Sequence, residues 1–319
     1  VIGILGVNPH IMGKLNLGID FSGGRNYIIR FAEPVNTQEV NAALDNVFME
    51  AKSELADEET FALNVITIGD ANQVRVSTNY RINDNSETLD DEIEALLYEG
   101  CKQFLPENVT LKEFTSTDIN PEIGIMQSQK VGPAIADDIT QSAVWAVLAA
   151  LLGIFLYVLL RFRNFSFSVG ALVGLAHNTL IVLGAYALLW KVMPFSMEID
   201  QSFIAAILTV IGYSINDTVV IFDRVREYTG LYPKRARKQN INDALNQTLS
   251  RTFSTSMSTL VVLIAIFCFG GETIRGFVFA LIIGVVVGTY SSLCVATPLA
   301  YDIQEALDRR KAKKAALNK

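Results

Sequence analysis

Five long apolar stretches dominate the second half of the chain. They run approximately over Ile139–Leu160, Phe165–Leu189, Ser202–Phe222, Phe253–Gly270 and Phe277–Ala300. Each is close to the length of about 20 residues with which an α-helix crosses roughly 30 Å of hydrocarbon. We therefore predict five membrane-spanning helices within residues 131–303, followed by a basic tail over residues 304–319.

Shorter alternations of apolar and polar residues characterise the chain before these stretches. Strand-like patterns occupy Tyr27–Phe31, Leu63–Ile68, Gln73–Thr78 and Val109–Thr115, and helical spacing of apolar residues occupies Thr37–Ala51 and Leu89–Leu105. In chain order these elements are β-α-β-β-α-β, the order of a ferredoxin-like α+β domain. We predict such a domain over residues 17–130.

The first residues of the chain are apolar but too few to cross a bilayer. Val1–Val7 is interrupted by glycine and is much shorter than the roughly 20 residues of a spanning helix. A short buried segment is one alternative, and a cleaved signal peptide is another, although the basic n-region and small-residue cleavage site of such a peptide are not visible. We interpret residues 1–16 as the remnant of a first membrane helix with its entry segment.

Charge divides the chain at the same place as the apolar pattern. Residues 1–130 carry 9 Lys and Arg against 21 Asp and Glu, whereas residues 131–319 carry 17 against 12. The basic residues gather after the first stretch, between the third and fourth, and behind the last, and these three positions lie on one side of the membrane. The positive-inside rule places that side, with the C-terminus, in the cytoplasm and the acidic domain outside.

Composition narrows the possible functions. Half of the residues are hydrophobic and the mean hydropathy is +0.33, which indicates an integral membrane protein. Cys101, Cys268 and Cys294 have no metal-ligand spacing, and His10 and His177 lie far apart. We also find no nucleophile with a base and an orienting group. We therefore predict no enzyme, no metal site, no cofactor and no nucleic-acid partner.

One carboxylate lies inside an apolar stretch. Asp217 would carry its charge to membrane depth at a cost of roughly 2.5–3.5 kcal/mol, so it is a candidate for handling an ion or a proton. The residues that share its helical face at three- and four-residue spacing are Thr209, Gly212, Tyr213, Asn216 and Val220. We expect this polar stripe to face other helices. The alternative is a carboxylate hydrated from the cytoplasmic edge.

Two further groups are candidates for contact with Asp217. Arg251 opens the fourth stretch among several hydroxyl residues, and a nearby cation would favour the ionised carboxylate. An ordinary basic residue at a helix end explains Arg251 equally well. His177 and Asn178, near the middle of the second stretch, are candidates for hydrogen bonds to the stripe, although a buried His-Asn pair more often serves packing.

Four motifs occur in a fixed order along the chain. They are Gly18-Ile19-Asp20-Phe21-Ser22-Gly23-Gly24, Val131-Gly132-Pro133, Arg161-Phe162, and the segment from Gly212 through Asn216 and Asp217 to Arg224. Together they resemble SecF, or the SecF half of fused SecDF proteins, in the resistance-nodulation-division superfamily. By this resemblance Asp217 matches the ion-coupling Asp of the family, Arg251 matches its essential Arg, and Gly18 to Gly24 matches the strand that enters the extracytoplasmic domain.

The resemblance implies an accessory subunit of the Sec translocon in the bacterial inner membrane that uses proton, or sodium, motive force in late-stage export. The implied partners are SecD or a fused SecD half, the SecYEG channel, the unfolded exported polypeptide and the lipid bilayer, with YajC and YidC as further candidates. Two alternatives stay open. A small-molecule or lipid exporter of the same superfamily would ordinarily need larger extracytoplasmic domains, and a non-transporting translocon scaffold would not require Asp217.

Two features depart from the family pattern. The family has six spans, and here the first is missing or reduced to Val1–Val7, which is consistent with a fragment of a fusion. The family commonly has His-Asp in the second stretch, where this chain has His177 and Asn178. Because Asn does not titrate, we predict that coupling within this chain depends on Asp217 alone.

Overall fold

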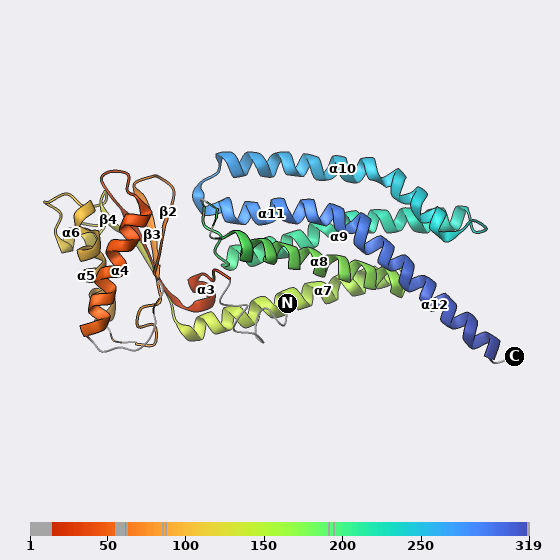
Figure 1. Cartoon of the computed structure of the whole chain (residues 1–319), viewed down its shortest axis with the longest axis horizontal. Coiled ribbons are helices and arrows are strands. Elements are labelled where there is room, and N and C mark those ends of the chain that lie inside the picture. The colour runs from red at the N-terminus through yellow and green to blue at the C-terminus, as the bar shows by residue number, and fades with distance from the viewer. Residues whose placement is uncertain are drawn as a thin grey trace.

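The chain forms a sheet domain and a helical bundle that lie end to end along the long axis of the molecule (Figure 1). The computed structural model describes residues 15–317 apart from 55–60, 62, 85, 87, 191 and 194. The remnant of a first membrane helix that we predicted in Val1–Val7 therefore lies outside the described residues. The last helix extends beyond the bundle to the C-terminus, at the end opposite the sheet domain.

In its described residues, the sheet domain has four strands, two long helices and three short helical turns. The elements are α3 (Ile19–Ser22), β1 (Gly24–Arg30), α4 (Thr37–Glu54), β2 (Leu63–Thr67), β3 (Gln73–Thr78), α5 (Leu89–Cys101), η1 (Lys102–Phe104), α6 (Leu111–Thr115) and β4 (Gly124–Val131). The strands lie in the order β2-β3-β1-β4, and each neighbouring pair is antiparallel. The predicted ferredoxin-like α+β domain is confirmed.

The last strand was predicted in the wrong place. Val109–Thr115 does not form it, because the Glu113 carboxylate accepts hydrogen bonds from the Thr110 backbone N–H and hydroxyl, both at 2.8 Å. This capping box starts the short helix α6 instead. The fourth strand is Gly124–Val131, a segment in which the sequence pattern predicted no strand.

One face of the sheet is covered by α4 and α5, which lie on the side away from the bundle (Figure 1). Alternate residues of the strands enter this core because successive side chains of a strand point to opposite faces. The fully or nearly fully buried residues from the strands and the two helices include Tyr27, Ile29, Val74, Val76, Val40, Leu44, Phe48, Ile93 and Leu97. The opposite, open face of the sheet is turned toward the bundle.

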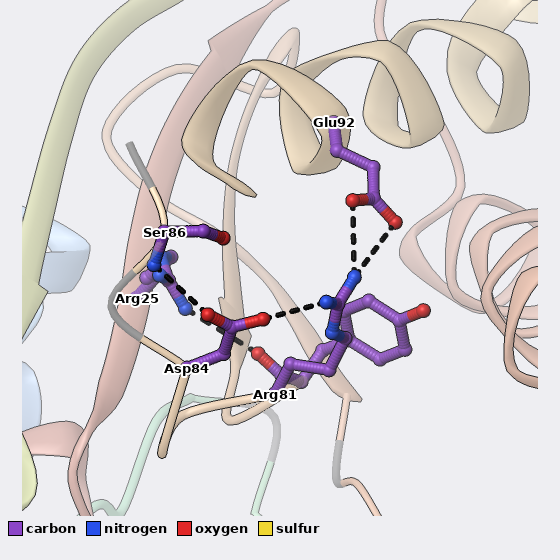
Figure 2. A network of polar contacts seen from close by, with 6 residues as sticks. Arg25, Arg81, Asp84, Ser86 and Glu92 are labelled. Carbon is purple, nitrogen blue, oxygen red and sulfur yellow. Dashed lines mark hydrogen bonds and ion pairs between the residues drawn. The ribbon is translucent and has the colours of Figure 1, made fainter. Parts of the chain in front are cut away.

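Ion pairs hold the segment between β3 and α5 (Figure 2). Arg81 has a φ of 44°, a left-handed conformation that residues other than glycine rarely adopt. Its guanidinium binds Asp84 at 2.6 Å and Glu92 at 3.0 Å. The hydrogen bond from the Ser86 backbone N–H, together with this guanidinium, holds the pKa of Asp84 below its usual value. The acidic start of α5 is partly exposed, and it carries structural ion pairs such as Arg81–Glu92.

Two glycines near the ends of β4 provide a matched test of backbone strain. Gly124 has a φ of 115°, and a Cβ there would lie 2.8 Å from the Phe114 Cα. Gly132 has a φ of −70° and open space around it. We expect Gly124→Ala to destabilise the sheet domain by about 1–3 kcal/mol and Gly132→Ala to have little effect. Thermal unfolding of the detergent-purified variants measures the difference, and equal midpoints would contradict it.

The part of the bundle that the structure describes has five long helices and a sixth that continues the fifth. The elements are α7 (Pro133–Phe162), α8 (Phe165–Leu189), α9 (Gln201–Leu231), α10 (Arg237–Phe269), α11 (Glu272–Ser291), a short π-helical segment η2 (Ser292–Ala296) and α12 (Thr297–Leu317). Among the described residues, five helical segments are long and apolar enough to cross a membrane, one of them combining α11, η2 and α12. The five predicted spans are confirmed.

The helices extend further than the apolar stretches do. α9 continues past Phe222 to Leu231, and α10 begins at Arg237 rather than near Phe253. The residues that we assigned to a basic tail, 304–319, continue α12 as far as Leu317. Apolar runs identify only the part of a helix that is long and apolar enough to lie in the membrane. They do not predict polar helical turns beyond it.

Glycines allow close approach between two pairs of elements, α11 with α9 and α8 with η2. A Cβ at Gly284 of α11 would lie 2.7 Å from Val210 Cγ1 of α9, and Gly288 contacts the same helix one turn further along. A Cβ at Gly170 of α8 would lie 2.6 Å from the Ala296 carbonyl oxygen of η2. The small-xxx-small spacing in the sequence therefore corresponds to real helix contacts.

Candidate functional site

Asp217 lies within the bundle on α9, about 24 Å from the first residue of the helix at 1.5 Å per residue. Its side chain is buried, with 5% exposed. The Ser256 hydroxyl of α10 donates to Asp217 Oδ2 at 3.5 Å. A hydroxyl, rather than a cation, is therefore the direct partner of the carboxylate.

A short chain of hydroxyls links Asp217 to a third helix. Ser256 Oγ lies 2.6 Å from Thr289 Oγ1 of α11, and either atom can be the donor. Thr289 also lies 2.9 Å from the Val285 carbonyl oxygen, which accepts its proton in the alternative arrangement. Because a hydroxyl carries one proton and accepts others, this chain can run in either direction.

The donor direction along these hydroxyls depends on whether the Asp217 carboxylate is ionised or protonated. An ionised Asp217 only accepts, so Ser256 donates to it and Thr289 can donate to Ser256. A protonated Asp217 can donate to Ser256, which then donates to Thr289, and Thr289 donates to the Val285 carbonyl. The geometry therefore allows two donor directions along the hydrogen bonds that join α9, α10 and α11, one for each protonation state of Asp217.

A second buried polar cluster surrounds the π-helical segment. Asn178 Nδ2 of α8 donates to Ser214 Oγ of α9 at 2.7 Å, and Thr218 Oγ1 lies 2.8 Å from Ser292 Oγ of η2. His177 Nδ1 lies 3.5 Å from Asn178 Oδ1. Asn178 thus reaches α9 at Ser214, beside Asp217 but outside the predicted polar stripe. π-Helical turns frequently occur at functional sites.

The predicted polar stripe faces other helices of this chain only in part. Thr209, Gly212 and Asn216 are exposed, and the buried side of α9 instead presents residues such as Ser214, Asp217 and Thr218. The glycine face of α11 packs on that buried side, which leaves the stripe outward. The expectation was therefore wrong for Thr209, Gly212 and Asn216.

One member of the stripe still makes a contact inside the bundle. The Tyr213 hydroxyl donates to Thr259 Oγ1 of α10 at 3.1 Å. Tyr213 lies one turn before Asp217 on α9, and Thr259 lies just beyond Ser256 on α10, so the two helices share a ladder of polar contacts.

The direct pairing that we expected between Asp217 and Arg251 is not formed. Arg251 is exposed, and no ion pair within 4.0 Å joins these two described residues. The reason is helical phase, because Arg251 and Ser256 are about 140° apart around α10 at 3.6 residues per turn. Ser256 faces α9, so Arg251 does not. Arg251 also lies well inside α10 rather than at its start.

The Gly18–Gly24 motif contacts the start of the helix that carries Asp217. The Gly18 N–H donates to the Ile199 carbonyl at 2.9 Å, and Asp20 Oδ2 accepts from the Gln201 N–H at 3.1 Å. Gln201 is the first residue of α9, where a carboxylate is favourable because the N–H groups there are unpaired and the helix dipole is positive. Phe21 packs into the apolar core of the bundle.

The motif then turns the chain into the sheet. Residues Ile19–Ser22 form the helical turn α3, so the strand that we expected in this motif begins only at Gly24. Gly23 and Gly24 have φ of 70° and 149°, and a Cβ on Gly24 would lie 2.8 Å from the Thr78 carbonyl oxygen. The two glycines therefore provide conformations that other residues resist.

Sequence reasoning missed a polar contact between the sheet domain and the bundle. Glu198, in the loop before α9, binds Arg75 Nη2 at 2.6 Å and accepts from Asn64 Nδ2 at 3.0 Å. Glu198 is one of the few charged residues in this loop, and that rarity was the available signal. Its partners could not be identified because they lie more than a hundred residues earlier in the chain. Thr289 was missed because its partner Ser256 lies on a different helix, and the sequence does not show which faces of α10 and α11 meet.

Comparison with known proteins identifies the family. Residues 111–306 match the family described as protein export membrane protein SecD/SecF, C-terminal, and residues 13–35 match the SecD/SecF GG motif. The chain belongs to the SecD/SecF family. The two matches contain the motifs from which the resemblance was inferred, the GG motif over Gly18–Gly24 and the C-terminal region around Asp217.

Relatives within the SecD/SecF family align over almost the whole chain. Protein translocase subunit SecF of Rhodothermus marinus is 40% identical over 95% of this chain and 88% of the relative. The same subunit of Thermodesulfovibrio yellowstonii is 36% identical over 94% and 87%. The crystal structure of SecDF, a translocon-associated membrane protein from Thermus thermophilus, superposes with a TM-score of 0.70 and 31% identity. That alignment covers 92% of this chain and 35% of the SecDF chain, so this chain spans about a third of it.

Proposed function

We propose that this chain is an accessory subunit of a Sec translocon that uses a proton gradient to assist late-stage export of polypeptides. Its relatives are named Protein translocase subunit SecF, and the similar SecDF structure is described as translocon-associated. The observation that carries the coupling part is Asp217, a buried carboxylate whose hydrogen-bond partner is a reversible hydroxyl chain.

Protonation of Asp217 would act on helix packing through that chain. Binding a proton removes the charge and reverses the donors between α9, α10 and α11, so the two states favour different contacts among the same three helices. A proton that crosses the membrane potential supplies about 2.3 kcal/mol per 100 mV. Rearranging the hydrogen bonds of Ser256 and Thr289 involves roughly 1 kcal/mol per bond. The free energy that one proton supplies is therefore of the required order.

The proposed topology places the sheet domain outside the cytoplasm of a bacterium, with the bundle in its inner membrane. Basic residues support it, since Arg161 lies in the last turn of α7 and Arg163 follows that helix, further basic residues join α9 to α10, and others line α12. Several of them also have carboxylate partners, for example Arg161 with Asp223 at 2.9 Å. The excess of Lys and Arg at this end favours the cytoplasm.

The exposed polar stripe indicates where a SecD partner binds. Thr209, Gly212 and Asn216 would be unfavourable against lipid and are small or polar enough for close contact with another helix. We propose that SecD, as a separate chain or a fused half, covers this face of α9. The SecYEG channel, YajC, YidC and the unfolded exported polypeptide are further proposed partners.

Gradient-dependent export from vesicles tests the proposal. Inverted inner-membrane vesicles that contain SecYEG, this chain and its SecD partner would be loaded with a precursor arrested part-way, and ATP would then be removed. We expect an imposed proton gradient to complete translocation, measured as protease-protected precursor. Completion driven by a sodium gradient alone would change the coupling ion, and no response to either gradient would favour a scaffold.

A further inference from the structure

One partly buried ion pair joins the sheet domain to the bundle. Arg75 Nη2 and Glu198 Oε2 are 2.6 Å apart, and their side chains are only 18% and 9% exposed. Asn64 Nδ2 donates to the other oxygen of the same carboxylate at 3.0 Å. Both carboxylate oxygens are thus held by the sheet domain, and such charge-assisted bonds are about twice as strong as neutral ones.

The pair lies at one edge of the sheet. Asn64 belongs to β2 and Arg75 to β3, the two strands at the start of the order β2-β3-β1-β4. Their side chains lie on the open face, opposite the core under α4 and α5, and this face is turned toward the bundle in Figure 1. Glu198 therefore holds the sheet by its β2–β3 edge.

The covalent links to the bundle lie at the other edge. The chain enters β1 through Gly23 and Gly24, which have positive φ, and leaves β4 through Gly132, which has open space around it. β1 and β4 are neighbours at the far side of the sheet from β2. Among the described residues, glycine links connect the sheet domain to the bundle on one side, and on the other side the Glu198 carboxylate holds it through the Arg75 ion pair and the Asn64 hydrogen bond. This is the geometry of a hinge on one side and an opposing side-chain contact on the other.

The surroundings of the ion pair are loosely packed. A small cavity of about 70 Å³ lies there, and its lining includes Arg75, Glu198, Asp200, Tyr186 and Phe203. Arg75 Nε is buried without a hydrogen-bond partner among the described residues. The interface at this edge therefore depends on the polar contact rather than on close apolar packing, so the contact can open without breaking a core.

Glu198, the carboxylate of this ion pair, is closely attached to the start of α9. Glu198 is three residues from Gln201, the first residue of that helix. Between them, the Ile199 N–H donates to the Asn16 carbonyl at 2.8 Å, and Asp200 Oδ1 accepts from the Phe203 N–H at 2.8 Å as a helix cap. A displacement of α9 along or about its axis would therefore move Glu198 with it.

We propose that the Arg75–Glu198 ion pair is a latch through which the sheet domain follows α9, and that the domain pivots about Gly23, Gly24 and Gly132 when the latch is open. The inference rests on the proposed function in one respect, since protonation of Asp217 supplies the movement of α9. The carboxylate that receives the proton and the carboxylate that holds the domain belong to one continuous helix with its cap.

Distance measurements between the two parts of the chain test the latch. Nitroxide labels would be placed on the native, exposed Cys268 of α10 and on α6 by Lys112→Cys, with Cys294 replaced by Ala. We expect Glu198→Gln to broaden the distribution of distances in vesicles. The double variant Arg75→Glu with Glu198→Arg restores the opposite charges, and we expect it to narrow the distribution again.

A matched control separates the latch from a general effect of charge. Glu99→Gln removes one partner of the exposed Lys102–Glu99 pair, which lies 3.2 Å apart on the same domain without touching the bundle. We expect it to leave the distribution unchanged. An unchanged distribution in Glu198→Gln, or equal broadening in Glu99→Gln, would overturn the latch.

Export measurements on the same variants test whether the ion pair transmits movement of α9 to the sheet domain. In the vesicle assay we expect Glu198→Gln to lose most of the gradient-stimulated translocation and the charge-reversed pair to recover it. A broadened distribution with unchanged stimulation would show that the pair orients the domain without transmitting movement, which would overturn the inference. If the wild-type chain shows no gradient stimulation, the proposed function fails, whereas the distance measurements still decide the latch.

Discussion

The Asp217→Asn variant is expected to fold like the wild type and to lose the response of export to a proton gradient. Asn has nearly the same shape as Asp and accepts the hydrogen bond from Ser256, so the contacts between α9 and α10 persist. The Asn amide does not titrate, so the donors and acceptors among residue 217, Ser256 and Thr289 do not change with pH. A buried carboxylate is also costly, by roughly 2.5–3.5 kcal/mol at the centre of a membrane helix, and the variant should be no less stable.

Asp223→Asn on the same helix is the matched control. Asp223 is about a third exposed and pairs with Arg161 and Arg226 at the end of the apolar part of α9. Exposed pairs contribute about 0–1 kcal/mol, so gradient-stimulated export should persist in this variant. Protease-protected precursor with and without the gradient measures both variants. Full stimulation in Asp217→Asn would remove Asp217 from the coupling mechanism, and equal loss in Asp223→Asn would point to a general effect of charge on α9.

The fold was predictable to the extent that local patterns determine it. Runs of apolar residues gave the five spans, and Gln73–Thr78 and Phe165–Leu189 were predicted with the bounds that the structure shows. The error at Val109–Thr115 has a local cause, since a Thr-x-x-Glu capping box competes with strand propensity in so short a segment. Helix ends beyond the apolar runs were missed because polar turns carry no membrane signal.

The candidate site was predictable only in its central residue. A carboxylate in an apolar helix is conspicuous in one dimension, so Asp217 was found. Its partner depends on which side of α10 faces α9, and that phase is set by the packing of three helices. Arg251 was chosen as the available cation at the start of the fourth apolar stretch, whereas Ser256 and Thr289 make the contacts. The Glu198 contact depends on the placement of a whole domain and has no local signature.

The Gly284→Leu variant is expected to disrupt the packing that holds Asp217 in place. A Cβ on Gly284 would already lie 2.7 Å from Val210 Cγ1 and 3.0 Å from Val210 Cβ, and Leu adds three further carbons in the same direction. Val210 is two turns before Asp217 on α9 and is nearly fully buried, so neither side chain can move aside. Overpacking of this kind costs typically about 1–3 kcal/mol and occasionally more, and we expect the upper end of that range.

Graded variants at other glycines separate this clash from the effect of replacing glycine in a helix. A Cβ on Gly288 of the same helix would lie 3.1 Å from Ser214 Oγ, whereas Gly153 of α7 has open space around it. Ala in place of Gly within a helix is favourable by roughly 0.8–1 kcal/mol in the absence of a clash. We therefore expect the midpoint of thermal unfolding in mild detergent to rise or stay level for Gly153→Ala, to change little for Gly288→Ala and to fall for Gly284→Ala.

The midpoint should fall furthest for Gly284→Leu. This variant should also lose gradient-stimulated export, because Ser256 and Thr289 reach Asp217 only while α9, α10 and α11 stay in contact. A midpoint for Gly284→Leu equal to that of Gly153→Leu would show that α9 and α11 do not depend on this approach.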